Sequence, residues 1–99
     1  MTTYEWRKLL QSIRKSFPIE NATIIVIRQP MKHNCGLTRF DGIGKFIIRI
    51  DSLQSDIGQS DSLIHEWAHA MAIAQAYHHQ GPWGVLYARI YDRWVRNWR

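Results

Sequence analysis

Two histidines and a glutamate stand together in the segment HEWAH, which covers residues 65–69. On an α-helix, His65 and His69 lie one turn apart on the same face, so both imidazoles can reach one metal ion. Zinc binds neutral imidazole well, and hydrolytic zinc sites combine three protein ligands with one water of lowered pKa. Glu66 could accept that water's proton and pass it to a leaving amine. The spacing predicts a site for one zinc ion that hydrolyses peptide bonds, with Glu66 as general base.

The HEWAH motif would also suit an amphipathic helix on which the two histidines are either solvated or packed in the core, without binding a metal. The residues around the motif argue against that interpretation, because they are apolar. They are Leu63, Ile64, Trp67, Ala68, Ala70 and Met71. An unpaired glutamate on a buried helix is costly, so we expect Glu66 to have a chemical role.

The third ligand has to come from outside the motif, and His79 is the first choice. It lies ten residues beyond His69, and each helical residue would carry the chain about 1.5 Å further away. We therefore expect the helix to end near residues 73–75, so that an extended segment brings His79 back. The intervening sequence AMAIAQAY has high helix propensity, so metal binding would have to override local preference.

Two other side chains remain open as the third ligand. His78 precedes His79 directly and has slightly less reach. Asp92 is a further alternative, because a carboxylate from a following helix can also complete a zinc site.

Three segments in the middle of the chain predict a small sheet. Residues 23–27, TIIVI, are β-branched almost throughout and predict a buried strand. Residues 37–40 and 45–50 flank DGIG, whose glycines suit a hairpin turn, so we expect these two strands to pair antiparallel.

Helices are expected on both sides of the strands. Thr2 and Glu5 have capping-box spacing and precede helical periodicity over residues 3–16. The helix that carries HEWAH is expected to open at an N-cap on Ser60 or Asp61. After Gly81, Pro82 and Gly84, residues 85–98 resume helical periodicity.

The segment HEWAHA, followed by a histidine that leads into GPWGVLYARIY, resembles the SprT-like zinc metallopeptidases. The short forms common among phage-encoded proteins are the most similar. In that family the third ligand is the histidine that opens an HGPEW or HGPEF element, which aligns with His79 and places Trp83 at the aromatic position. The resemblance implies a zinc-dependent endopeptidase that acts on a protein or peptide substrate.

The resemblance also implies a fold, the minimal zincin core shared with the minigluzincins. This α+β fold has an N-terminal helix, a three-stranded and mainly antiparallel sheet, the HExxH active-site helix and a C-terminal helix. At 99 residues, the chain is long enough for one such domain, covering residues 1–99.

Composition places the chain among globular proteins of a reducing compartment. Apolar residues make up 45% and charged residues 21%, and no apolar run reaches the roughly 20 residues of a membrane span. Because the N-terminus lacks the apolar stretch of a secretion signal, we expect a cytoplasmic protein without membrane association. Cys35 is the only cysteine, and we interpret it and His33 as loop or strand residues rather than ligands.

The net charge of +5 suits association with a polyanion. On the predicted last helix, Arg89, Arg93 and Arg96 recur at helical spacing beside an aromatic stripe, a pattern that could bind single-stranded DNA. In the other interpretation the aromatic residues pack in the core and the arginines are solvated. The alternative function is accordingly a nucleic-acid-associated accessory protein with a structural zinc and weak or no proteolysis.

Overall fold

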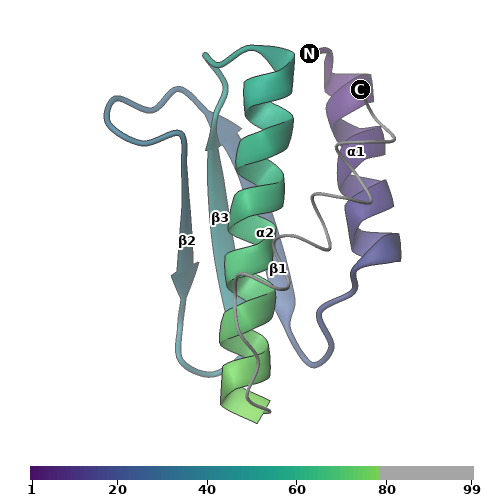
Figure 1. Cartoon of the computed structure of the whole chain (residues 1–99), viewed down its shortest axis with the longest axis vertical. Helices are drawn as coiled ribbons and strands as arrows, with labels where there is room; N and C mark the ends of the chain where they lie inside the picture. Colours follow the sequence, from purple (N-terminus) through teal and green to yellow (C-terminus); the bar gives the residue numbers. More distant parts are fainter. Residues whose placement is uncertain (79–99) are drawn as a thin grey trace.

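The computed structural model describes residues 1–78, with side chains to residue 75 (Figure 1). This part of the chain has an α+β fold of two helices and a three-stranded sheet. Its elements are α1 (Thr3–Ser16), β1 (Thr23–Gln29), β2 (Gly36–Phe40), β3 (Lys45–Asp51) and α2 (Asp56–His78). The predicted last helix, residues 85–98, lies outside the described residues. Neither described helix has the length and apolar character that crossing a membrane requires.

The sheet is mixed, with the strand order β1-β3-β2. As predicted, β2 and β3 pair antiparallel, with Phe40 opposite Phe46. The expectation of a mainly antiparallel sheet is wrong, because β1 pairs parallel to β3 along its whole length. β3 takes the centre because Phe46, Ile48 and Ile50 are buried on it, and a central position covers the most apolar surface.

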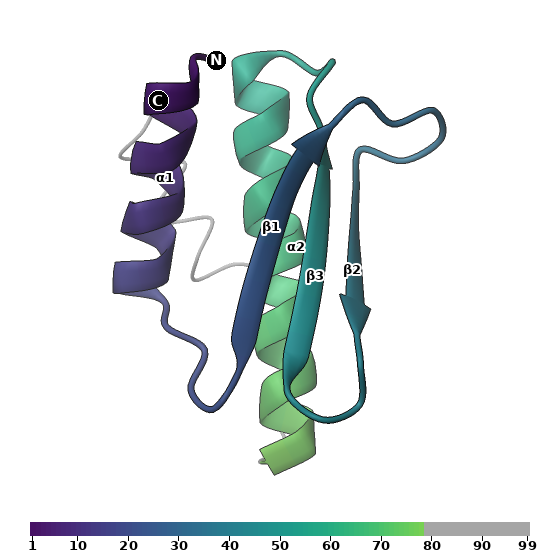
Figure 2. The ribbon, with the colours of Figure 1, turned by 180° about the vertical axis from the view of Figure 1, so that it is seen from behind.

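Both helices lie against the same face of the sheet, and Figure 2 shows the strands from the opposite side. The core forms between these two layers and contains Ile13 from α1, Ile48 from β3 and Trp67 from α2. The indole N–H of Trp67 donates a hydrogen bond to the carbonyl oxygen of Phe17 at 2.9 Å. This bond fixes the middle of α2 to the residue that follows α1.

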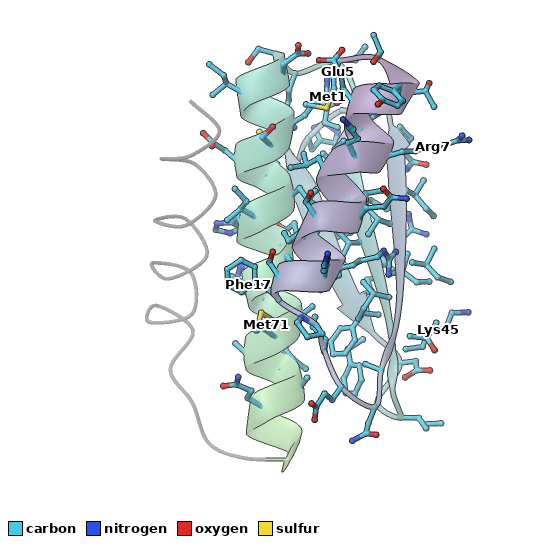
Figure 3. The ribbon with its side chains drawn as sticks, turned by 90° about the vertical axis from the view of Figure 1, so that its right-hand side faces the viewer. Met1, Glu5, Arg7, Phe17, Lys45 and Met71 are labelled. Carbon is cyan, nitrogen blue, oxygen red and sulfur yellow. The ribbon has the colours of Figure 1, made fainter. Side chains whose placement is uncertain are left out.

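Helix α1 has the predicted bounds and the predicted capping box. The side chain of Thr2 accepts a hydrogen bond from the backbone of Glu5, and the carboxylate of Glu5 accepts one from the backbone of Thr2. At the other end, Arg14 donates to the carbonyl oxygen of Ile24 at 2.8 Å, and its guanidinium lies 5.7 Å from the ring centroid of Trp67. Arg14 thus has a structural role, whereas Arg7 extends away from the protein (Figure 3).

Helix α2 begins earlier than predicted, at Asp56 rather than after Ser60 or Asp61. The hydroxyl of Ser55 accepts a hydrogen bond from the backbone N–H of Gly58 at 3.1 Å, which is the geometry of an N-cap. Gly58 lies in this first turn, where the cap offsets the low helix propensity of glycine.

Helix α2 also ends later than predicted. It continues to His78, so the expected end near residues 73–75 is wrong. Ala70, Ala72, Ala74 and Ala76 give this stretch high helix propensity, and the partly buried Met71 and Ile73 pack against the core. Local preference and packing therefore agree on a continuous helix.

Candidate metal centre and general base

The rings of His65 and His69 converge on one side of α2. Their Nε2 atoms are 3.0 Å apart, and the ring planes meet at 73°. Two nitrogen ligands of a tetrahedral zinc ion, each about 2.0–2.1 Å from the metal, stand about 3.3 Å apart. The two imidazoles therefore fit a shared zinc with a shift of a few tenths of an ångström. A hydrogen bond between the rings has a similar length, so the distance alone suits both arrangements.

Glu66 lies buried between α2 and the sheet, with 8% of its surface exposed. The hydroxyl of Thr38, on β2, lies 2.8 Å from carboxylate atom Oε1 and can donate a hydrogen bond to it. The same hydroxyl is 3.1 Å from the main-chain oxygen of Glu66. The second carboxylate atom, Oε2, lies 3.9 Å from Nε2 of His65, which is beyond hydrogen-bond distance. One oxygen is thus held by the strand, and the other lies nearer the imidazole pair.

Gly36 allows this close approach of β2 and Glu66. A Cβ atom at position 36 would lie 2.8 Å from Cγ of Glu66 and 3.3 Å from Oε2. Both distances are shorter than ordinary van der Waals contact. The carboxylate stem of Glu66 therefore packs directly on the backbone of β2.

Burial lowers the pKa of His69 below its ordinary value of 6.5. The neighbouring His65 lowers this pKa further, while the carboxylate of Glu66 opposes the shift. A lowered pKa keeps the imidazole neutral at physiological pH. Because zinc binds the neutral ring, this shift reduces the competition between protons and a metal ion at His69.

The described side chains, which end at residue 75, add no third ligand to this pair. Among the side chains of residues 1–75, no group of three histidine, cysteine or acidic residues is placed to hold a metal ion. His33 and Cys35 are exposed in the connection between β1 and β2. The predicted ligands His79 and Asp92 and the predicted nucleic-acid contacts lie outside the described residues. These contacts are Arg89, Arg93 and Arg96.

The position of His78 disfavours it as a ligand of the same ion. It closes α2, nine residues beyond His69. At about 1.5 Å per residue, the backbone of His78 is about 13 Å further along the helix axis. His79 follows directly, so a zinc site that includes it requires the chain to turn back after the helix.

Sequence reasoning identified the motif but missed Gly36 and Thr38. Their alternation with Phe40 places all three on the face of β2 that packs against the helices. The available signal was two small residues, Gly36 and Thr38, on the same strand face as the partly buried Phe40. The sequence of β2 does not show that Glu66 of α2 packs against this face.

Comparisons with models of protein families and with curated proteins find no match to this chain.

Proposed function

We propose that this protein is a zinc-dependent peptidase of the SprT-like type. His65 and His69 supply two of the zinc ligands, and Glu66 is the general base. The observation that carries the proposal is the convergence of the two Nε2 atoms at 3.0 Å on the helix that also holds the buried Glu66. A lone histidine pair would serve a structural site equally well, but the adjacent buried carboxylate suits hydrolysis.

A bound zinc ion would supply Lewis acidity and lower the pKa of a water molecule in the site. The chain supplies the proton acceptor. Glu66 can accept a proton at Oε2 and return it to the amine of the cleaved bond, while Oε1 stays hydrogen-bonded to Thr38. Burial of Glu66 reduces competition from bulk water and strengthens its electrostatic interactions in the site.

The third ligand remains assigned to His79 by its match to the family pattern, with His78 and Asp92 as alternatives. Zinc content distinguishes them, because replacement of a ligand weakens metal binding while replacement of a neighbour does not. We expect His79→Ala to lose zinc, and His78→Ala and Asp92→Ala to keep it. Full zinc retention in His79→Ala together with loss in Asp92→Ala would move the assignment to the carboxylate.

The proposed activity is tested with zinc-loaded protein and an unfolded protein substrate, comparing wild type with Glu66→Gln. Glutamine preserves the shape of the side chain and an oxygen acceptor for Thr38, but it cannot act as the base. We expect cleavage by wild type and by Glu20→Gln, which changes an exposed glutamate outside the motif, and none by Glu66→Gln. Equal cleavage by wild type and Glu66→Gln would overturn the proposal. Zinc binding without cleavage by wild type would favour the accessory-protein alternative.

A further inference from the structure

The face of β2 that packs on α2 contacts Glu66 at two points. Gly36 lies against the stem of the side chain, where a Cβ atom would come within 2.8 Å of Cγ. Thr38, two residues along the same strand face, meets the carboxylate at Oε1. The central strand supports both positions, because Gly36 is opposite Ile50 and Thr38 is opposite Ile48. These two isoleucines are fully buried, so the register of β2 is fixed by the core.

We propose that Thr38 is a positioning residue for the general base. Its hydroxyl holds Oε1 of Glu66, so that Oε2 is presented as the proton acceptor. This inference rests on the proposed peptidase function and extends it to a residue outside the HExxH motif.

The geometry explains why such a contact is needed. The glutamate side chain has three rotatable bonds, and its terminal torsion is broad rather than confined to narrow wells. Packing on Gly36 restricts the stem of the side chain, and the terminal torsion then sets which oxygen meets Thr38. A hydrogen bond to one oxygen restricts that last rotation and distinguishes the two oxygen atoms. Catalytic groups that are held in place avoid an ordering cost during reaction.

The test compares Thr38→Val, which keeps the shape but removes the hydroxyl, with Thr38→Ser, which keeps the hydroxyl. The substrate is a fluorogenic peptide based on a cleavage site mapped in the unfolded protein. Per zinc-loaded molecule, we expect Thr38→Val to lower kcat by about 10- to 100-fold, in line with the cost of a misplaced catalytic group. KM should stay within about threefold, since binding of the substrate ground state is unchanged. Thr38→Ser should recover most of kcat.

Two controls separate positioning from a general loss of structure. Thr23→Val changes an exposed threonine on β1 and should keep the wild-type kcat. In the double variant Thr38→Val/Glu66→Gln, the valine should cause no further loss beyond that of Glu66→Gln alone, because residues that act through one group are non-additive. A purely structural role for Thr38 would instead lower the melting temperature without changing kcat per zinc-loaded, folded molecule.

The outcomes for this inference and for the proposed function are distinguishable. An active wild type with an unchanged kcat in Thr38→Val overturns the positioning role and leaves the peptidase proposal standing. A loss in Thr38→Val that Thr38→Ser does not recover also overturns it. If the zinc-loaded wild type does not cleave the substrate, or if Glu66→Gln cleaves it equally well, the peptidase proposal is overturned. The positioning role is then overturned with it.

Discussion

The substitution Gly36→Ala probes the packing of the general base most sharply. The added Cβ would lie 2.8 Å from Cγ of Glu66, whereas carbon atoms pack best at about 3.5–4.0 Å. Either Glu66 or β2 must therefore move by roughly 0.7–1.2 Å. Cγ lies in the middle of a buried side chain, and β2 is paired to the core strand β3. We expect the carboxylate to take up most of the shift.

Two opposing effects determine the stability of this variant. Overpacking of a core costs about 1–3 kcal/mol. Replacing glycine by alanine in an extended strand returns about 0.4–1 kcal/mol, because the unfolded chain loses conformational freedom. The free energy of unfolding should therefore fall by at most about 2.6 kcal/mol. A shift of about 1 Å in a catalytic group can cost about 100-fold in rate, so we expect kcat to fall far more than stability alone would explain.

Urea unfolding followed by tryptophan fluorescence measures the first effect, and peptide cleavage per bound zinc measures the second. Gly44→Ala is the matched control, because its Cβ would meet only the carbonyl oxygen of Asn21 at 3.4 Å. It should change stability little and keep the wild-type kcat. A Gly36→Ala protein with wild-type stability and kcat would refute the packing described for Glu66.

Three further predictions concern stability. In the metal-free protein, the lowered pKa of His69 means that the unfolded chain binds more protons than the folded chain below pH 6.5. The free energy of unfolding should therefore fall as the pH drops below that value. In urea titrations, His69→Gln should weaken this pH dependence. Hydrogen bonds from the backbone N–H groups of Gly44, Lys45 and Ile43 lower the pKa of Asp41. Asp41→Asn should therefore lower the melting temperature at pH 7. The difference in melting temperature from wild type should shrink as the pH falls below about 3.8. Ile48→Ala should lower the free energy of unfolding by about 2–5 kcal/mol in chemical denaturation, because this side chain is fully buried in the central strand.

Local sequence signals predicted the fold well where short-range chemistry determines it. The capping box of Thr2 and Glu5 defined the start of α1, and the turn after Asp41 defined the hairpin of β2 and β3. The parallel pairing of β1 with β3 could not be read in this way. Strand pairing depends on which strand buries the most apolar surface, and that is a property of the assembled core.

The same distinction applies to the candidate site. The helical period of 3.6 residues was enough to predict that His65 and His69 share a face, and their Nε2 atoms do converge. The contacts of Glu66 with Gly36 and Thr38 join segments about 30 residues apart, so no local pattern could predict them. Helix α2 continues past residues 73–75 because the alanine-rich stretch has high helix propensity, and the expected requirement for a third ligand does not override that local preference.

Zinc stoichiometry tests the central claim most directly. Purified, untagged protein is dialysed against zinc, and bound metal is measured by mass spectrometry in wild type and single variants. We expect one zinc ion per chain in wild type, in Glu66→Gln and in His33→Ala, whose histidine is exposed on the loop before β2. His65→Ala and His69→Ala should each lose the metal while keeping the far-ultraviolet circular dichroism of the fold. Undiminished zinc in both of these variants would contradict the metal site, and with it the proposed peptidase.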